Sequence, residues 1–238
     1  IEEWWEGGGN AGECFEVVVN GLEVATLVFM RYKKSGEGWA KMNMNIVDTG
    51  YGLERLTWLS QGTASAYEAV FGNALRKIKR IFNAESMPEI LKELSKKAGL
   101  ISITSGSDLV KLRKEVANKI GIPYEELVDA VVPLEAAYII ADHSKTLALM
   151  FGDGVVPSNT KEGYLARLVL RRAMRFRNMM GVDTELSRFV MLMLREMRRD
   201  FPELWRERKY IREITEIEED RYNETIKRGK LTVLKSLK

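Results

Sequence analysis

The chain has 238 residues, of which 45% are hydrophobic and 30% are charged. These proportions are typical of a globular protein with a buried core, and they exclude wholesale disorder. The 37 lysines and arginines barely exceed the 34 acidic residues, and the net charge is +3. A charged partner therefore has to be inferred from where the charges lie along the chain, and not from their total.

The scarcity of cysteine and histidine limits the classes of site. Cys14 is the only cysteine and His143 the only histidine. An internal disulfide is excluded, as are zinc modules and other metal sites built from several such ligands, so no metal site is predicted. No apolar run is long enough to span a membrane, and the first residues do not resemble a signal peptide. We expect a cytoplasmic protein without membrane contact.

The first 50 residues predict an antiparallel meander of about three strands. The three runs are residues 14–19, 22–32 and 39–47. Asn20-Gly21 separates the first two runs, and this dipeptide is a strong hairpin signal. In the third run Met42, Met44 and Ile46 alternate with polar residues, which is typical of a half-buried strand. So small a sheet is expected to be the end of a larger one.

From Leu53 onward the apolar residues follow the 3.6-residue period of amphipathic helices. Helices are predicted near residues 53–60, 72–82, 88–98, 107–120, 124–151, 160–180 and 184–199, and a long one from about 203 to 236. Glycines and prolines separate them. The predicted fold class is therefore α+β, with an antiparallel sheet followed by a mostly helical region. The patterns do not predict a role for residues 84–133.

A first candidate site runs from Asp48 to Arg55. Gly50 and Gly52 allow the backbone to approach a flat ligand closely. Arg55 lies in the first turn of a predicted helix, where the helix dipole also favours a phosphate. Asp48, at the end of a predicted strand, is placed to pair with an ammonium group. The residues alone nevertheless favour a simpler interpretation, a strand-to-helix turn whose glycines only allow the bend.

The second candidate site is a basic helix face. Residues 161–180 contain six basic side chains and one acidic side chain. Arg167, Arg171 and Arg175 are spaced by four, so they follow one face of the predicted helix, and Arg172 is next to Arg171. A line of guanidinium groups is typical of a surface that binds a nucleic-acid backbone. An ordinary solvated helix face is the alternative, and the scarcity of nearby acidic residues favours binding.

Asn159, just before this helix, has two interpretations. It precedes Glu162 by three residues, as in a capping box, and would then cap the helix N-terminus. Its carboxamide both donates and accepts hydrogen bonds, which also suits base edges in the shallow minor groove of A-form RNA. Without further context the residues favour the cap.

Taken together, these motifs resemble those of the alanyl-tRNA synthetase family, most closely its archaeal members. The resemblance covers nearly the whole chain, and the order and spacing of the motifs are jointly specific. The segments that carry it are Trp5–Gly12, Val28–Met30, Val47–Arg55, Ala141–His143 and Gly152–Arg175.

The resemblance implies a class II ligase that activates alanine with ATP and Mg²⁺ and then transfers it to the 3′ end of tRNA(Ala). It implies two catalytic residues, Asp48 on the alanine ammonium group and Arg55 on the γ-phosphate of ATP. Gly50 and Gly52 would join Arg55 at the ATP, and Gly50 would also line the alanine pocket. The other residues implied for this pocket are Thr26, Val28 and Trp5, with Trp4 as the alternative to Trp5.

The same resemblance implies that the helical region binds the tRNA acceptor stem. Asn159 would read a G·U wobble pair there, an implication that outweighs the capping interpretation. The implied acceptor-stem residues are Asn159, Arg167, Arg171, Arg172 and Arg175. The implied domains are the C-terminal part of a class II catalytic domain, residues 1–83, and a helical tRNA-recognition domain, residues 84–238.

Two motifs that should precede residue 1 and a zinc-binding editing domain have no counterpart in this sequence. We therefore expect a ligase fragment, with zinc confined to the editing domain. The isolated chain is expected to bind tRNA but to form little adenylate, because the arginine for the α-phosphate belongs to one of those motifs. The alternative is a non-catalytic helical RNA-binding module that keeps a relic of the Asp48–Arg55 motif. Neither the residues nor the resemblance predicts the oligomeric state.

Overall fold

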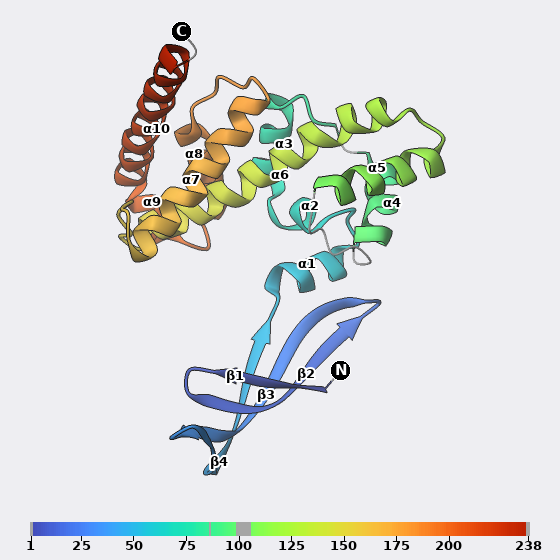
Figure 1. The fold of residues 1–238 in the computed structure, drawn as a ribbon, viewed down its shortest axis with the longest axis vertical. Helices are drawn as coiled ribbons and strands as arrows, with labels where there is room; N and C mark the ends of the chain where they lie inside the picture. The colour runs from blue at the N-terminus through green and yellow to red at the C-terminus, as the bar shows by residue number, and fades with distance from the viewer. Residues whose placement is uncertain (1, 86, 99–105, 237–238) are drawn as a thin grey trace. The chain divides into compact units, whose positions relative to one another are not determined.

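The structure is a computed structural model that describes residues 2–85, 87–98 and 106–236. The chain divides into two compact units, residues 1–70 and 71–238. Among the described residues, the first unit contains a sheet and two helices, whereas the second consists of helices and their connections (Figure 1). The predicted α+β fold class is confirmed.

The sheet of the first unit is antiparallel, with the strand order β1-β2-β3-β4 (Figure 1). Its strands are β1 (Glu2–Gly7), β2 (Asn10–Val19), β3 (Leu22–Ser35) and β4 (Gly38–Tyr51). The prediction of about three strands is wrong by one, because the glycine-rich start of the chain also pairs with β2. Gly8 and Gly9 permit this hairpin, since their φ values of 57° and 81° are rarely adopted by residues with a side chain.

The predicted burial along β4 is only partly right. Met42 packs against the buried cluster of the sheet, but Met44 is 65% exposed. The pairing of β3 with β4 is irregular between Met30 and Tyr32, and residues 42–45 lie outside its register. The alternation of buried and exposed side chains is therefore interrupted there.

Two helices follow the sheet in the first unit, α1 (Leu53–Gln61) and α2 (Ala66–Val70). α1 ends at Gly62, which has a left-handed φ of 62° and donates its amide hydrogen to the Trp58 carbonyl. Glycine is the usual residue at such helix ends. α2 is missing from the sequence prediction, because five residues are too few for a helical period to be recognised.

The sequence predicted most helices of the second unit to within two residues at each end. They are α3 (Gly72–Ile81), α4 (Pro88–Ala98), α5 (Gly106–Ile120), α6 (Tyr124–Gly152), α7 (Lys161–Met179), α8 (Leu186–Met197), α9 (Pro202–Arg206) and α10 (Arg208–Ser236). The single helix predicted from about 203 to 236 is wrong, because Glu207 separates α9 from α10. This break lets Leu204 pack on Gly152, where a β-carbon would lie only 2.2 Å from the leucine side chain.

α6 lies at the centre of the second unit and contacts α3, α5, α7, α8, α9 and α10. Its side chains are buried all around the helix, as expected for a helix that other helices surround. Leu147 and Phe151, in its C-terminal half, are fully buried. Its N-terminal part joins α4 and α5 in a separate cluster that includes Val116 and Leu127.

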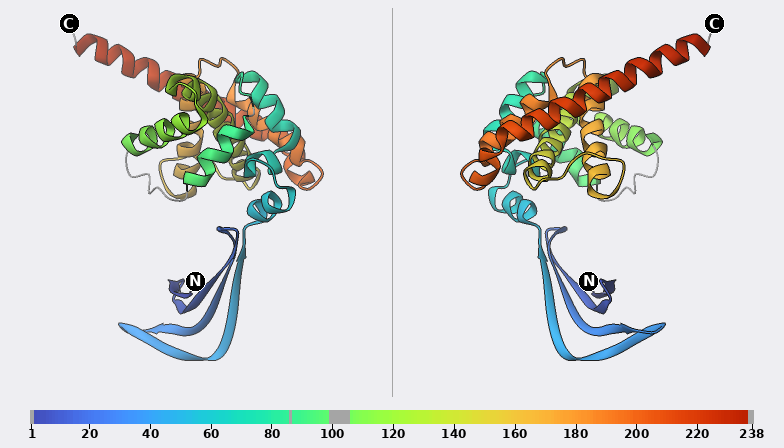
Figure 2. Two further views of the ribbon diagram at one scale, coloured as in Figure 1. Left: turned by 90° about the vertical axis from the view of Figure 1, so that its right-hand side faces the viewer. Right: turned by 90° about the vertical axis from the view of Figure 1, so that its left-hand side faces the viewer.

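Only the first half of α10 packs on the other helices. Its buried residues end at Glu219, and Figure 2 shows the rest of the helix extending beyond its neighbours in the unit.

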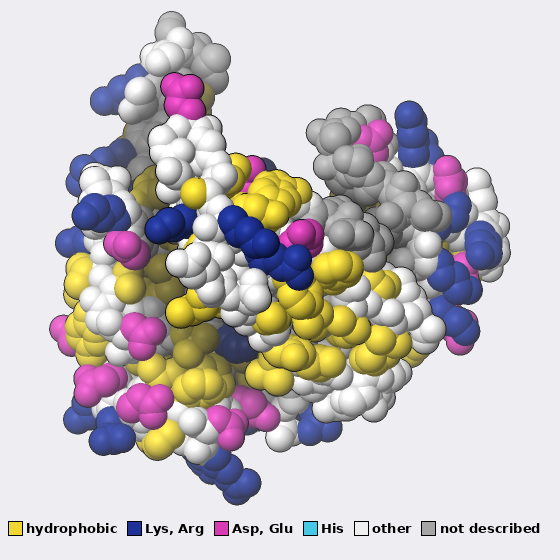
Figure 3. Space-filling model, turned by 90° about the horizontal axis from the view of Figure 1, so that it is seen from below, with side chains coloured by type: hydrophobic (Ala, Val, Ile, Leu, Met, Phe, Trp, Pro, Cys, Tyr) yellow, Lys and Arg dark blue, Asp and Glu magenta, His cyan; other side chains and the backbone are white. Residues whose placement is uncertain are grey.

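None of the described helices combines the length and the apolar content needed to cross a membrane. Apolar side chains still reach the surface, and Figure 3 shows a face on which they gather between basic and acidic ones.

Candidate functional site

One face of the sheet brings together residues that the sequence predicted for an alanine pocket. In the register of β3 with β4, Thr26 is opposite Gly50 and Val28 is opposite Asp48. Side chains alternate along a strand, so residues two apart and their cross-strand partners share a face. The four residues therefore form two neighbouring cross-strand pairs on one surface, the pocket face.

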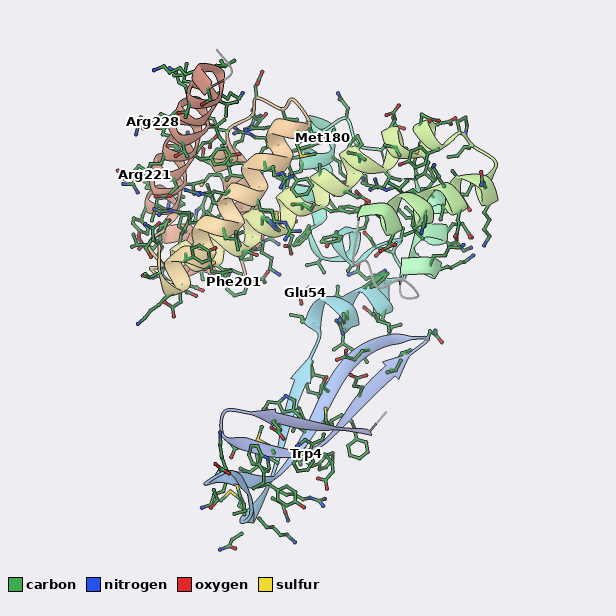
Figure 4. The ribbon with its side chains drawn as sticks, in the orientation of Figure 1. Trp4, Glu54, Met180, Phe201, Arg221 and Arg228 are labelled. Atoms are coloured by element: carbon green, nitrogen blue, oxygen red, sulfur yellow. The ribbon has the colours of Figure 1, made fainter. Side chains whose placement is uncertain are left out.

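Of the two tryptophans, Trp5 is the one that lies on the pocket face. It packs against the buried cluster that includes Cys14 and Val28, and these two residues are cross-strand partners. Trp4, labelled in Figure 4, is one residue earlier and therefore points to the opposite face. Its ring centroid lies 5.4 Å from that of Tyr32. The structure thus brings Trp5 together with Val28 and leaves Trp4 apart.

The pocket face combines an apolar surface with a carboxylate. Val28 is 6% exposed and belongs to the buried cluster, whereas Asp48 is exposed. Apart from its chain neighbours, no atom of the described residues lies within 4 Å of the position that a β-carbon would take at Gly50. Such a surface can hold an ammonium group at the carboxylate and a small side chain against the apolar residues.

Arg55, on α1, is held by Glu23, a residue that the sequence reasoning did not single out. Arg55 Nη1 donates to the carbonyl oxygen of Glu23 at 3.0 Å and lies 3.1 Å from its carboxylate Oε2. The Thr26 hydroxyl donates to the other carboxylate oxygen at 2.8 Å. These hydrogen bonds, from Thr26 and then Arg55, lower the pKa of the Glu23 carboxyl. Glu23 thus links the predicted ATP-binding arginine to the predicted pocket threonine.

A β-bulge lies next to Glu23. The pairing of β2 with β3 shifts between Val17 and Val18, so that Val24 is an extra residue in β3. Bulges change the direction of neighbouring side chains and are common at functional sites. No local pattern could have indicated Glu23, because Arg55 is 32 residues away and the two meet only when the strands pair.

Gly52 contributes to the position of Arg55. Its amide donates to the carbonyl oxygen of Val24 at 3.0 Å, which ties the start of α1 to β3. A β-carbon at Gly52 would lie 3.0 Å from the Arg55 side chain. Glycine therefore allows Arg55 to lie close to the backbone at this turn.

The second unit carries a basic groove of about 560 Å³, lined by residues of α7 and α10. Three exposed arginines, Arg171, Arg172 and Arg175, line it. The other lining residues are Leu168, Phe176, Met179 and Tyr222. Guanidinium groups beside aromatic and apolar side chains can bind phosphates and stack on nucleotide bases.

Arg167 differs from the other arginines of the predicted line, because it is paired with Glu218 of α10. Two hydrogen bonds of 3.0 and 3.1 Å join its guanidinium to that carboxylate. Arg221, labelled on α10 in Figure 4, also donates to Glu218. Burial by itself would raise the pKa of Glu218, but the hydrogen bonds from Arg167 and Arg221 outweigh burial and lower it.

The capping interpretation of Asn159 is wrong. Thr160 is the N-cap residue of α7, and within the described residues no side-chain hydrogen bond caps the helix. Lys161, the first residue of α7, has a left-handed φ of 48°, which distorts the start of the helix. The Oδ1 of Asn159 instead accepts a hydrogen bond of 2.6 Å from Arg167 Nη1. A tertiary contact, and not the helix end, holds this side chain.

Glu218 is the second important residue that the sequence reasoning missed. It lies 51 positions from Arg167, among the acidic residues at positions 216–220. A run of acidic residues on a helix usually marks a solvated face. Nothing in that run distinguishes Glu218, which becomes buried only because α10 packs on α7.

Metal donors are not gathered in the described part of the chain. No three histidine, cysteine, aspartate or glutamate side chains within residues 2–85, 87–98 and 106–236 are close enough together to hold a metal ion.

Comparison with known proteins identifies the family. The family described as "tRNA synthetases class II (A)" matches residues 1–238. An alanine–tRNA ligase from Methanococcus vannielii is 46% identical over 242 residues, which cover 99% of this chain and 27% of the relative. The alanine–tRNA ligase from Pyrococcus abyssi is 48% identical over 96% of this chain and 26% of the relative. The one from Methanosphaera stadtmanae is 44% identical over 100% of this chain and 26% of the relative. The chain thus spans about a quarter of the length of these relatives. Since the family match extends over every residue, the chain belongs to the class II tRNA synthetases.

Proposed function

We propose that this chain is part of an alanine–tRNA ligase. The whole enzyme activates alanine with ATP and Mg²⁺ and transfers it to the 3′ end of tRNA(Ala). This chain contributes the alanine pocket, an arginine for the ATP phosphates and a surface for the acceptor stem. The observation that supports the proposal most is the register of β3 with β4, which gives Thr26, Val28, Asp48 and Gly50 a common face.

Alanine binds on the pocket face in this proposal. Asp48 pairs with the ammonium group, a charge-assisted hydrogen bond that contributes about 1.5–3 kcal/mol. Thr26, Val28 and Trp5 surround the methyl group, and Gly50 leaves the backbone open to the ligand. A pocket sized for one methyl group excludes larger side chains but rejects glycine by only about 1–3 kcal/mol. Accurate charging therefore needs a separate hydrolytic site elsewhere in the enzyme.

Arg55 binds the γ-phosphate of ATP, beside Gly50 and Gly52. A guanidinium group has five N–H donors in a plane, and both the hydrogen bond to the Glu23 carbonyl oxygen and the ion pair with its carboxylate use Nη1. Glu23 thereby orders the long arginine side chain before ATP arrives, which reduces the entropy lost on binding.

The tRNA acceptor stem binds at the basic groove of the second unit. Arg171, Arg172 and Arg175 contact backbone phosphates, and Asn159, next to Arg167, reads the wobble pair. This division is physically reasonable, because phosphate contacts position a nucleic acid whereas base contacts specify its sequence.

The proposal keeps residues 1–83 as the C-terminal part of the catalytic domain and residues 84–238 as the tRNA-recognition domain. The compact units divide after residue 70, and α3 packs on α6 and α8. The assignment of residues 71–83 to the catalytic domain therefore rests on the resemblance alone.

We also propose a cytoplasmic location for the protein. A non-catalytic RNA-binding module is not favoured, because the relatives named above are ligases.

Asp48→Asn in a complete ligase that carries these residues tests the proposal. Loss of the carboxylate charge should raise the KM for alanine by about ten- to hundredfold in ATP–pyrophosphate exchange. The KM for ATP should stay within about twofold, because Asp48 does not contact ATP in the proposed site.

Asp129→Asn, which neutralises an exposed aspartate on α6, is the matched control and should change neither constant. An unchanged KM for alanine in Asp48→Asn would contradict the role of Asp48. Lack of alanine-dependent exchange by the unaltered ligase would contradict the proposed function itself.

A further inference from the structure

Arg167 connects an exposed amide to a buried acid. Its Nη1 donates to the Oδ1 of Asn159 at 2.6 Å, while its Nε and Nη2 donate to the two carboxylate oxygens of Glu218 at 3.0 and 3.1 Å. Nη2 also donates to the carbonyl oxygen of Pro157 at 3.3 Å. Because the guanidinium group is planar and rigid, these contacts fix its plane and, through it, the position of the Asn159 side chain.

The direction of the Asn159 carboxamide follows from the chemistry of arginine. A guanidinium group only donates hydrogen bonds, so the atom of Asn159 that faces Arg167 must be the acceptor Oδ1. The Nδ2 group, with its two N–H donors, then points away from Arg167. Asn159 is exposed, and within the described residues its Nδ2 has no hydrogen-bond partner. Nδ2 is therefore the part of the side chain that remains for a ligand.

Glu218 holds Arg167 in this position. The Glu218 side chain is 5% exposed and that of Arg167 is 17% exposed. Removing one partner of a buried ion pair leaves an uncompensated charge, so the pair is costly to break. Arg221 donates a further hydrogen bond to the same carboxylate.

Arg167 is poorly placed for a phosphate. It does not line the basic groove, whereas Arg171, Arg172 and Arg175 do. Its guanidinium group is already paired with Glu218, and most of its surface is buried. Its role in RNA binding should therefore differ from that of the three exposed arginines.

We propose that Arg167, held by Glu218, is a positioning residue that orients Asn159 to meet RNA as a hydrogen-bond donor through Nδ2. The inference rests on the proposed function of this surface and assigns a role to two residues that need not touch the RNA. The acceptors that the bases present in the RNA minor groove are pyrimidine O2 and purine N3. A wobble pair shifts the pyrimidine O2 from its Watson–Crick position. A donor fixed in one place distinguishes these two positions, whereas a mobile donor does not.

Glu218→Gln in the 238-residue chain tests the inference. The variant keeps the shape of the side chain but removes the charge that holds Arg167. The measured quantities are the dissociation constants for two acceptor-stem hairpins that differ in one pair, wobble or Watson–Crick, at several salt concentrations.

Discrimination is the dissociation constant for the Watson–Crick hairpin divided by that for the wobble hairpin. This ratio should fall by about fivefold or more, to the value found for Asn159→Ala. The slope of the logarithm of the association constant K against the logarithm of the salt concentration should not change, because no phosphate contact is lost. Combining Asn159→Ala with Glu218→Gln should cause no further loss of discrimination, since both changes remove the same contact.

Glu219→Gln is the matched control for a purely structural effect. Glu219 pairs with the buried Arg177 of α7 and accepts a hydrogen bond of 2.9 Å from the amide of Leu186. Its substitution also breaks a buried ion pair between α7 and α10, so it should lower thermal stability but leave discrimination unchanged. Arg171→Gln is the complementary control. The slope of log K against log salt should become less negative by about 0.9, and discrimination should again be unchanged.

Failure of the proposed function and failure of the inference give different results. Equal binding of the two hairpins by the unaltered chain would contradict base reading by Asn159. NMR relaxation of the Asn159 side-chain amide then decides the inference without RNA. The amide should be rigid in the unaltered chain and in Glu219→Gln, and mobile in Glu218→Gln. An amide that is equally mobile in all three, or discrimination that survives Glu218→Gln, would overturn the inference.

Discussion

Three arginines of α7 show how far the role of a side chain depends on its partner. Arg171 is exposed and lines the basic groove. Arg167 is paired with Glu218, and Arg177 is buried against the neighbouring Glu219. The spacing of these arginines along the sequence predicts which of them share a helix face. It does not predict which are neutralised by a second helix.

Gly163, in the first turn of α7, should be essential for the loop that carries Asn159. A β-carbon at Gly163 would lie 2.3 Å from the Ser158 hydroxyl oxygen and 2.4 Å from the Val156 carbonyl oxygen. Gly163→Ala should therefore displace the loop and lower the free energy of unfolding by about 1–3 kcal/mol. It should also weaken discrimination between the two hairpins. Urea unfolding and hairpin titrations measure these effects.

Gly229→Ala is the matched control for this steric argument. Gly229 is exposed on α10, and in the part of the chain that the structure describes no atom outside the helix lies within 4 Å of the position of an added β-carbon. The same substitution should here increase the free energy of unfolding by about 0.5–1 kcal/mol, because alanine is a better helix former than glycine. Equal effects at the two glycines would contradict the argument.

At the level of elements, local patterns predicted most of the helices because an amphipathic period involves residues that are close in the sequence. The predictions of strands and helices are wrong where a contact with a residue far away in the sequence determines the structure. β1 is a strand because β2 pairs with it, and the break between α9 and α10 accompanies the packing of Leu204 on Gly152. In both cases the deciding contact is tertiary.

The contact between α4 and α5 should weaken in acid. Glu93 of α4 pairs with Lys96 and, across the two helices, with Lys119 of α5. Hydrogen bonds from Lys119 and then Lys96 lower the pKa of Glu93 from 4.5 to about 2. A pKa that is lowered by folding stabilises the folded state above the unfolded value. This contribution is lost as the pH falls from 4.5 to about 2.

The protection factors of the α4 and α5 amides, which compare their exchange rates with the intrinsic rate at each pH, should therefore decrease as the pH falls over this range. Glu93→Gln should make the protection factors in these two helices less dependent on pH. Glu89→Gln, which changes an exposed acid in the first turn of α4, is the control and should preserve the dependence. Identical pH profiles for Glu93→Gln and the unaltered chain would contradict the role of the ion pairs.

For the whole molecule, the important feature is that the two candidate sites belong to different compact units. The pocket face and Arg55 lie within residues 1–70, whereas the basic groove, Asn159 and Glu218 lie within residues 71–238. The second unit has its own buried core around α6. RNA binding should therefore be separable from the amino-acid and ATP site.

Residues 71–238, produced alone, should bind the acceptor-stem hairpins with an affinity within about twofold of that of the whole chain. If Arg171, Arg172 and Arg175 each neutralise one phosphate, log K should fall against log salt with a slope of about −2.7, since each contact contributes about −0.9. Filter binding at several salt concentrations measures both quantities. A tenfold loss of affinity would show that the first unit takes part, and a slope near zero would contradict phosphate binding.

The sequence by itself determined the fold class, most of the helices, the hairpin at Asn20-Gly21 and the motifs that identify the family. These depend on residues that are close together in the chain or on the order of short motifs. The tertiary structure decided that Trp5, and not Trp4, lies with Val28, and that an acid holds each of two key arginines. Arg55 and Arg167 meet those acids across 32 and 51 residues. No local period specifies such contacts, because they exist only once strands pair in register and helices pack across one another.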